Sequence, residues 1–281
     1  MYEVDIERDV VYCQAPGYWK DASEDPGGSL PVTLFPGKLK SLDLDMDIYK
    51  PAGDGRGRRP LLLMMHGGSF FIGNKNETGQ SLWCRHFASL GYVAVSINYR
   101  MGFRLSKRAY CKAEDRAVED ADAALAYLLG RSDLRIDSDR IFAAGTSAGA
   151  IVALRLAFRP AGNHPAIRAI GNFWGSVRDL SVLENASTPI LSFQATEDPI
   201  MPYRGGYPFK KAAWGPSRIF APYMYGTGAV HERALQLGIH AEHHAYPMAK
   251  HRLHLDREGN PTPIFYEIQD RMAAFFGEEL S

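Results

Sequence analysis

Apolar strand-like segments alternate with helical patterns along most of this chain, and no other feature constrains its fold as strongly. Residues 43–49 alternate polar and apolar side chains, as a half-buried strand does. Continuous apolar runs, typical of strands buried on both faces, and further strand patterns cover 61–66, 91–99, 140–145, 166–174, 189–195 and 241–246. Predicted helices cover 112–130, 148–158, 228–238 and 263–280. Such alternation builds βαβ units, so we expect an α/β protein with a mostly parallel central sheet and helices on both faces.

The chain has 281 residues, without an internal repeat or a clean boundary, so we expect a single domain over 1–281. Two segments do not fit the alternation. The first, 14–42, is rich in proline and glycine and is predicted to be irregular. The second, 199–227, is an aromatic-rich insert. Long loops inside a compact domain are usually functional or disordered, and the aromatic content of the second argues against disorder.

Charge and composition exclude several kinds of partner. Lys and Arg together number 32, as do Asp and Glu, so no basic surface for nucleic acid or anionic membrane is expected. The N-terminus lacks the pattern of a signal peptide and no apolar stretch is long enough to span a membrane. We therefore expect a cytoplasmic protein, with a periplasmic or secreted location open if a leader is missing. A homo-oligomer is compatible with the sequence.

Three cysteines stand far apart in the chain, at Cys13, Cys84 and Cys111. Their odd number and wide spacing match neither a disulfide framework nor a zinc site. We interpret them as free thiols, mostly buried.

The segment "AAGTSAGA", residues 143–150, places Ser147 between a predicted buried strand and a predicted apolar helix. Gly145 and Gly149 bracket it as Gly-x-Ser-x-Gly. A strand that turns directly into a helix leaves no room for side chains two positions either side of the turn. The serine is then held in a strained conformation with its hydroxyl projecting from the sheet, at a helix N-terminus that favours negative charge. This context predicts that Ser147 is a nucleophile rather than a residue of an ordinary Gly/Ser-rich turn.

The segment "HGGSF", residues 66–70, follows the strand "LLLMM" and resembles the His-Gly-Gly-Gly oxyanion loop of esterases and lipases. That resemblance implies that the backbone N–H groups of Gly68, Ser69 and Ala148 hold a developing oxyanion. Ser69 stands where the third glycine is usual. It keeps its N–H, but it has less conformational freedom than glycine.

An acid is expected after the nucleophile, on the loop behind a later strand. The strand 189–195 runs into Thr196, Glu197 and Asp198, and either carboxylate could orient an imidazole. Asp198 is favoured because the pattern Thr-x-Asp-x-x-x-Pro resembles the acid turn of these hydrolases. The alternative for Asp198 is a turn cap before Pro199.

A base is expected on the loop after the last strand, and only His251 and His254 of the nine histidines lie there. The others fall in the oxyanion loop, far from the required position, or in predicted helices and strands: His66, His86, His164, His231, His240, His243 and His244. "YPMAKH" resembles the Tyr-Pro-Gly-x-Gly-His turn common before a catalytic histidine. His251 is therefore the predicted base, with His254 as the alternative.

The order Ser147, Asp198, His251 is that of the α/β-hydrolase fold. The chain resembles its bacterial carboxylesterase and lipase branch, among feruloyl- and acetylxylan-esterase-like proteins, from about residue 43 to the end. The segments that carry the resemblance are "DIYKPAG", "LLMMHGGSFFIGNK", "GYVAVSINYR", "DSDRIFAAGTSAG" and "TEDPIMPY". The resemblance implies ester hydrolysis through an acyl-enzyme, with no metal and no organic cofactor.

The substrate is predicted only in outline, as a small-molecule ester. Phe173 and Trp174 are expected to wall the acyl side, and the aromatic insert, with Tyr207 and Trp214, is expected to line the pocket mouth, although core filling explains it equally well. We expect short-chain or aromatic acyl esters, including acylated sugars. A serine peptidase of the same fold and a non-catalytic binding protein on this scaffold are the alternatives. A peptidase usually carries a propeller or cap domain, and a binding protein typically lacks one member of the triad.

Overall fold

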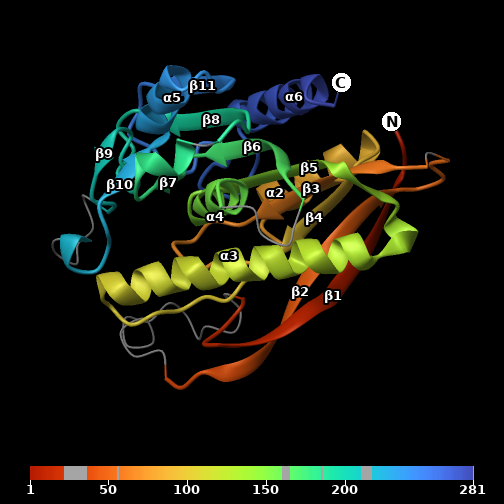
Figure 1. Cartoon of the computed structure of the whole chain (residues 1–281), viewed down its shortest axis with the longest axis horizontal. Helices are drawn as coiled ribbons and strands as arrows, with labels where there is room; N and C mark the ends of the chain where they lie inside the picture. The colour runs from red at the N-terminus through yellow and green to blue at the C-terminus, as the bar shows by residue number, and fades with distance from the viewer. Residues whose placement is uncertain (22–36, 56, 160–164, 185, 210–216, 281) are drawn as a thin grey trace.

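A sheet of eight strands runs through the part of the molecule that the structure describes, and helices cover both of its faces (Figure 1). The structure is a computed structural model that describes all residues except 22–36, 56, 160–164, 185, 210–216 and 281. The strands of this sheet are β1 (Val4–Gly17), β2 (Lys40–Pro51), β3 (Arg59–Met65), β4 (Val93–Ile97), β5 (Ile136–Thr146), β6 (Ile167–Phe173), β8 (Ile190–Ala195) and β11 (Ala241–Tyr246). The α-helices are α2 (Thr78–Ser89), α3 (Lys107–Gly130), α4 (Ala148–Ala157), α5 (Thr227–Gln236) and α6 (Pro263–Glu278).

The strand order is β1-β2-β4-β3-β5-β6-β8-β11. β2 pairs antiparallel with both β1 and β4, and all pairs from β4 to β11 are parallel. The predicted mostly parallel sheet is therefore confirmed. Every residue of the central strand β3 is buried, which explains its unbroken apolar run because parallel strands are covered on both faces.

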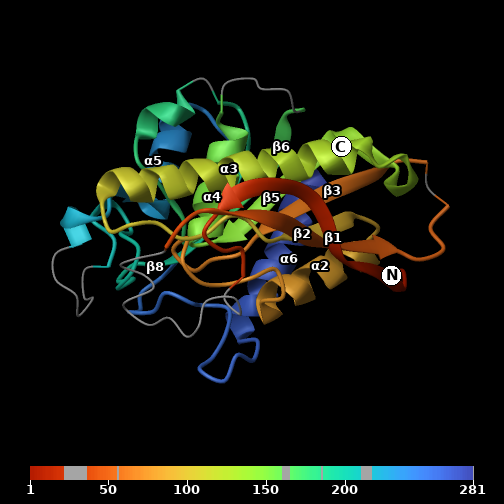
Figure 2. The same ribbon diagram turned by 90° about the horizontal axis from the view of Figure 1, so that it is seen from below.

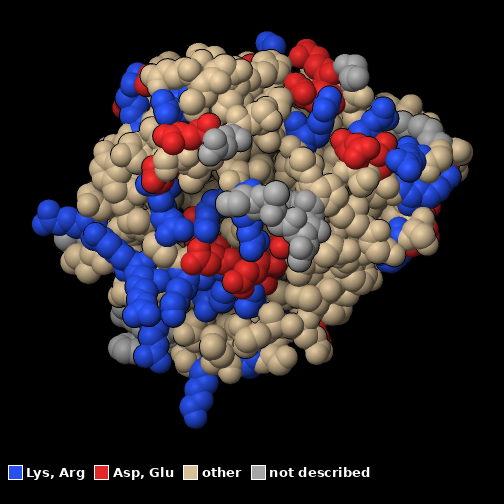
Figure 3. All heavy atoms as spheres, in the orientation of Figure 1, with Lys and Arg blue, Asp and Glu red and all other residues tan. Residues whose placement is uncertain are grey.

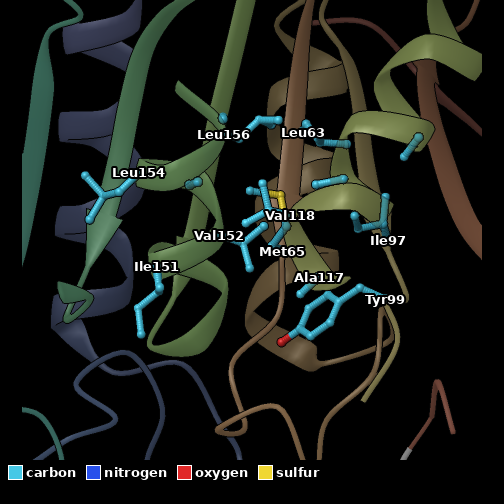
Figure 4. Close-up of a cluster of buried hydrophobic side chains, with 14 of the residues drawn as sticks. Leu63, Met65, Ile97, Tyr99, Ala117, Val118, Ile151, Val152, Leu154 and Leu156 are labelled. Atoms are coloured by element: carbon cyan, nitrogen blue, oxygen red, sulfur yellow. The ribbon is translucent and has the colours of Figure 1, made fainter. Parts of the chain in front are cut away.

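Helices α3, α4 and α5 pack on one face of the sheet, and α2 and α6 pack on the other (Figure 2). On the first face, side chains of β3 point toward those of α4 and α3, among them Met65, Val152 and Val118 (Figure 4). On the second face, Trp83 of α2 stacks on Phe265 of α6 with ring centroids 5.0 Å apart. These two apolar layers fix the strand ends from which the site loops emerge.

The N-terminal region differs from the prediction of an irregular segment over 14–42. Residues 14–17 belong to β1 and 40–42 belong to β2, so both ends of that segment are regular strand, while 22–36 lie outside the described residues. β1 is an edge strand that carries several charged residues, and its register shifts near Asp9, which has a φ of 55°. A bulged edge strand with an exposed face gives no continuous hydrophobic pattern, which is why the sequence does not predict it.

Two short strands of the aromatic-rich insert 199–227 belong to a second, small sheet. Its strands β9 (Gly205–Gly206) and β10 (Met224–Gly226) pair with each other, and β10 also pairs with β7 (Ser176–Val177). Residues 210–216, and with them Trp214, lie outside the described residues. The insert is therefore joined to the segment that follows β6 by backbone hydrogen bonds.

Charges of both signs are intermixed on the face of the molecule drawn in Figure 3. Ion pairs connect α3 and α4, as between Asp115 and Arg155 at 2.8 Å. Among the described residues, no helix combines the length and the apolar character that crossing a bilayer demands.

A buried lysine, Lys75, connects the segment after the predicted oxyanion loop to the antiparallel edge of the sheet. Lys75 is 2% exposed, and its Nζ lies 2.6 Å from an oxygen of Asp47 and 2.7 Å from an oxygen of Asp9. Its backbone N–H donates to the Asn98 side chain (2.8 Å), and its carbonyl accepts from the Ser96 hydroxyl (2.8 Å). These contacts fasten the chain between the loop at 66–73 and helix α2.

We expect Lys75→Met to lower the free energy of unfolding by about 3 kcal/mol, because the fully buried carboxylate of Asp47 then keeps only the partly exposed Arg8 guanidinium, at 2.9 Å, as its cation. Urea denaturation measures this loss. The matched control is Arg204→Met, which removes the cation of an exposed ion pair with Glu232 and should cost about 1 kcal/mol or less. Equal losses in the two variants would contradict the role given to Lys75.

Candidate active site

The predicted site residues gather at the carboxyl ends of the parallel strands, where α/β proteins usually bind ligands. The loop 66–69 follows β3, Ser147 follows β5, and Trp174 follows β6. Asp198 and His251 lie on the loops that follow the neighbouring strands β8 and β11. The sheet therefore brings together groups that are more than a hundred residues apart in the chain.

Ser147 occupies a sharp turn between β5 and α4, with a φ of 52° and a ψ of −114°. A Cβ on Gly145 would lie 2.4 Å from the carbonyl carbon of Gly149, and a Cβ on Gly149 would lie 2.1 Å from the carbonyl oxygen of Met65. Neither position has room for a side chain. The two glycines of the motif thus allow α4 to leave the sheet immediately, and the left-handed conformation of the serine is the consequence.

One line of hydrogen bonds joins the serine, a histidine and a carboxylate. The Ser147 hydroxyl lies 2.9 Å from Nε2 of His251, and the N–H at Nδ1 of His251 donates to Oδ2 of Asp198 at 2.7 Å. Ser147 and Asp198 are buried, and the His251 side chain is 16% exposed. In this arrangement the carboxylate fixes the imidazole with Nε2 free to accept the serine proton.

The structure distinguishes between the two carboxylates of the acid turn. Asp198 is buried, and its Oδ1 accepts the backbone N–H groups of Ile200 (2.8 Å) and Met201 (3.0 Å). Glu197 is exposed at the surface. Asp198 thus caps the turn with one oxygen and meets His251 with the other, so the two interpretations of this residue are compatible.

The loop after β3 passes directly over the serine. A Cβ on Gly67 would lie 3.4 Å from the Cβ of Ser147, and the loop closes through N–H groups of Phe71 and Ile72, which both donate to the Gly68 carbonyl. Gly68 has a φ of 106° and Ser69 a φ of 56°. Ser69 therefore adopts a left-handed conformation that favours glycine, which accounts for the glycine usual at this position.

His66 is the first residue of this loop and is held as a neutral ring. It is buried, it stacks on Tyr99 with ring centroids 4.3 Å apart, and its Nδ1 lies 2.7 Å from the Gly67 carbonyl. Burial lowers the pKa of His66 to about 4. The ring supports the loop and lies outside the line of hydrogen bonds that contains Ser147.

His254, the alternative base, belongs to a second carboxylate–imidazole pair. Its ring is 1% exposed, lies against Trp83 and Trp174, and places Nε2 3.1 Å from an oxygen of Glu77. The structure thus brings His251, and not His254, into contact with Ser147. No local sequence signal points to Glu77, because α2 begins with a Thr-Gly-Gln segment that has little apolar character.

A cavity of about 330 Å³ opens beside the serine. Trp174 lines it as expected, and Ile200 and Phe209 from the insert contribute apolar surface. The described residues that line it are His66, Gly67, Gly68, Ser69, Ile72, Gly73, Glu77, Thr146, Ser147, Trp174, Ile200, Phe209, His251, Arg252 and His254. The sequence reasoning missed Ile72, Glu77 and Arg252.

Two predicted substrate residues lie elsewhere in the described structure. Phe173 is fully buried between the sheet and α2, where its ring contacts Trp83 and Phe193, because it is the last residue of β6 and faces the core. Tyr207 packs edge-on against Tyr223 and lies under the ammonium of Lys107. The expectation that these two rings line the pocket is therefore wrong, and Phe209 takes the place expected of Tyr207. Trp214 lies outside the described residues.

A larger hollow of about 630 Å³ lies between α3, α4 and the segment after β6. Several of its charged side chains pair within the hollow, as Glu114 does with Arg155 (3.1 Å) and Arg178 (3.4 Å). It contains none of the predicted site residues.

Within the described ranges, no three His, Cys, Asp or Glu side chains are grouped to hold a metal ion.

Comparison with protein families supports the identification of the fold. The model of the BD-FAE family matches residues 46–164, a range that includes the predicted oxyanion loop and the turn at Ser147. The matched range ends before Asp198 and His251. The match to this family model therefore includes Gly68, Ser69, Ser147 and Ala148 but not the predicted acid and base.

Solved structures of bacterial esterases share the fold. Thermogutta terrifontis esterase 2 phosphorylated by paraoxon has a TM-score of 0.66 at 18% identity, covering 98% of this chain and 94% of that one. The same esterase with propionate bound has a TM-score of 0.63 at 20% identity, covering 84% and 90%. Inhibited esterase B from Lactobacillus rhamnosis has a TM-score of 0.60 at 15% identity, covering 99% and 87%. The predicted α/β-hydrolase fold is confirmed.

Curated relatives match only in part. The non-reducing polyketide synthase mapC' of Penicillium brevicompactum is 29% identical over 177 residues, which are 59% of this chain and 8% of that protein. The synthase prhL of Penicillium brasilianum is 31% identical over 131 residues, or 45% of this chain and 5% of that protein. The gibberellin receptor GID1 of Oryza sativa subsp. japonica is 33% identical over 106 residues, 36% of this chain and 28% of the receptor. The chain thus spans small fractions of these relatives.

The two histidine environments predict different reactivities. We expect His251→Ala to slow modification of the Ser147 hydroxyl by a fluorophosphonate about 10²–10⁴-fold, because it removes the proton acceptor. His254→Ala should retain the rate within about tenfold, since its ring contacts Glu77 and not the serine. The rate of labelling followed by mass spectrometry measures both. A fast His251→Ala variant beside a slow His254→Ala variant would exchange the roles of the two residues.

Proposed function

We propose that this protein is a serine carboxylesterase that hydrolyses short-chain or aromatic acyl esters, including esters of sugars, through an acyl-enzyme. One observation carries the proposal: the hydrogen-bonded line from the Ser147 hydroxyl through His251 to Asp198. This line begins at a strained strand–helix turn and faces a cavity. Nucleophile, base and orienting acid then have the geometry that acyl transfer requires.

In the first half-reaction, the Ser147 oxygen attacks the ester carbonyl carbon while its proton moves to Nε2 of His251. The tetrahedral intermediate collapses when the bond to the alcohol oxygen breaks and the imidazolium gives its proton to that oxygen. Asp198 keeps the imidazole oriented and stabilises its positive charge. The acyl group remains on Ser147, and the alcohol leaves.

In the second half-reaction, water attacks the acyl carbon and His251 takes its proton. The bond to the serine oxygen breaks, Ser147 regains its proton from the imidazolium, and the carboxylic acid is released. In both steps the N–H groups of Gly68, Ser69 and Ala148 are the proposed donors to the oxyanion. Each donor of this kind contributes about 3 kcal/mol to transition-state stabilisation.

The size and lining of the cavity favour small acyl groups. Its volume of about 330 Å³ lies at the low end for ligand pockets, and Ile72, Trp174, Ile200 and Phe209 supply apolar surface. A short aliphatic chain or one aromatic ring fits such a space, and aromatic walls suit an aromatic acyl group. The esterase whose structure holds propionate supports a small acyl group by analogy.

A non-catalytic binding protein is the second candidate, because the gibberellin receptor GID1 is among the relatives. The complete set of Ser147, His251 and Asp198 at hydrogen-bond distances argues against it. A serine peptidase of the same fold is the third candidate. The modest cavity beside the serine favours a small ester over a polypeptide.

A panel of substrates tests the proposed function. We expect p-nitrophenyl acetate, butyrate and benzoate to be cleaved much faster than the dodecanoate, because the cavity is too small for a long chain. Aminoacyl p-nitroanilides should be cleaved far more slowly. The Ser147→Ala variant is the control and should lose about 10⁴–10⁶ in kcat.

Each alternative predicts a different outcome of the panel. Faster cleavage of the anilides than of the esters would identify a peptidase. Failure of the folded protein to cleave any member of the panel, with no reaction between Ser147 and a fluorophosphonate, would favour the binding protein. A Ser147→Ala variant with wild-type turnover would exclude this serine as the nucleophile.

A further inference from the structure

The carboxylate of Asp198 has a further partner that the sequence motifs do not reveal. Gln194 lies in β8, four residues before Asp198, and its side chain is fully buried. Its Nε2 lies 3.3 Å from Oδ2 of Asp198, the same oxygen that accepts the N–H of His251. Nε2 also lies 3.1 Å from the carbonyl oxygen of Met201, in the turn whose N–H groups bind Oδ1 of Asp198.

The surroundings fix which end of the Gln194 amide is nitrogen. The atoms around Nε2 are acceptors only: the Asp198 carboxylate and the carbonyls of Met201 and Pro202. The atoms around Oε1 include the backbone N–H of Thr227, at 3.1 Å, and the hydroxyl of Thr227, at 2.8 Å. Reversing the amide would set acceptors against acceptors and a donor against a donor, so the amide donates toward Asp198.

This order extends one residue further. Because Oε1 of Gln194 can only accept, the Thr227 hydroxyl donates to it. The Thr227 oxygen is then left to accept from Nε2 of His243, which lies 3.0 Å away. Burial lowers the pKa of His243 to about 4, so the ring is neutral at pH 7 and carries its single proton at Nε2. The donors therefore run in one direction, from His243 through Thr227 and Gln194 to Asp198.

We propose that Gln194 is a positioning residue for the hydrolytic reaction, and that Thr227 and His243 hold its amide in the orientation that donates to Asp198. The inference rests on the proposed function, in which Asp198 orients His251. Together with the N–H of His251 and the two backbone N–H groups at Oδ1, the Gln194 amide gives the carboxylate four donors. A carboxylate held on both oxygens keeps its plane aligned with the imidazole.

Loss of the Gln194 amide should change the pH dependence of catalysis in one direction. Without the Gln194 amide, Oδ1 stays bound to the turn, but Oδ2 interacts with the His251 N–H alone and attracts a proton on that ring more strongly. Protonated His251 cannot accept the serine proton, so the acid limb of kcat/KM should move to higher pH. Loss of alignment should also lower kcat, whereas KM should change little, because Gln194 does not line the cavity.

The principal test is Gln194→Met, which keeps the length of the side chain and removes its hydrogen bonds. We expect kcat for p-nitrophenyl acetate to fall about tenfold to a hundredfold with KM within about threefold, and the acid limb to shift upward. The matched control is Ser192→Ala, which removes another buried polar group two residues earlier on the same strand. Ser192 bonds to Asn172, so the control should leave kcat and the pH profile unchanged.

A second pair of variants tests the proposal even if the Gln194→Met protein does not fold. Thr227→Val removes the hydroxyl that holds the amide, whereas Thr227→Ser keeps it. We expect kcat to fall about threefold to tenfold in Thr227→Val and to stay within twofold in Thr227→Ser. A Thr227→Val protein as active as Thr227→Ser would contradict the proposal, as would a folded Gln194→Met protein with unchanged kcat and pH profile. A fall in kcat without any shift of the limb would also overturn it, since it indicates a structural role only.

An NMR titration separates this proposal from the proposed function. In protein with ¹⁵N-labelled histidines, assigned with His251→Ala, the ring signals of His251 report its protonation without any substrate. A His251 titration that moves to higher pH in Gln194→Met supports the proposed contact even if no ester is cleaved. If esters are cleaved but this titration is identical in wild type and variant, the positioning role is wrong and the esterase proposal stands.

Discussion

The close approach of helix α4 to the end of strand β3 is the constraint on which the site depends. The Cα of Gly149 lies so near the backbone of Met65 and His66 that no side chain fits there. Helix α4 begins at Ala148, one residue before this contact, so the residue that precedes the helix, Ser147, must turn with a positive φ of 52°. The loop that follows β3 crosses directly above Ser147. One packing contact between two backbones thus sets Ser147, the proposed nucleophile, beside the loop of the proposed oxyanion donors.

The other two members of the line come from the far half of the sheet. β8 and β11 are adjacent and parallel, so the loops that carry Asp198 and His251 leave the sheet side by side. In the sheet, β6 lies between β5 and the pair β8 and β11. The loop after β11 therefore crosses the end of β6 to bring His251 to Ser147. Trp174 directly follows β6, and its ring packs edge-on against the ring of His251, with the ring centroids 6.4 Å apart. Buried hydrogen bonds at Asp198, rather than apolar packing alone, fix the outer end of this line.

Local patterns predicted the features that local chemistry determines. The apolar runs of β3 and β5 and the glycines around Ser147 each reflect a backbone requirement that can be seen within about ten residues. The edge strand β1 escaped prediction because charges and a bulge break its pattern. The sequence does not predict the neighbours of the site for another reason. Glu77 and His254 are 177 residues apart in the chain, and no spacing rule connects them.

The substrate side of the site was the least predictable from sequence. Phe173 and Trp174 are consecutive and belong to one buried cluster, with ring centroids 6.3 Å apart, yet only Trp174 lines the cavity. Phe173 is the last residue of a strand in the core, and Trp174 begins the turn that follows it, with a φ of 47°. In the same way, Phe209 and not Tyr207 reaches the cavity. Whether a ring reaches the cavity depends on the turn geometry, and composition carries no information about that.

In the proposed mechanism the hydroxyl of Ser147 becomes covalently acylated during turnover. Trapping this acyl-enzyme is the most direct test of the mechanism. The protein would be mixed with p-nitrophenyl acetate, quenched in acid within milliseconds, digested and analysed by mass spectrometry. We expect a burst of p-nitrophenol and an acetyl group on Ser147, and in His251→Ala neither the burst nor the acetyl group. Steady ester hydrolysis with no acetylated peptide, or with the acetyl group on another residue during turnover, would contradict it.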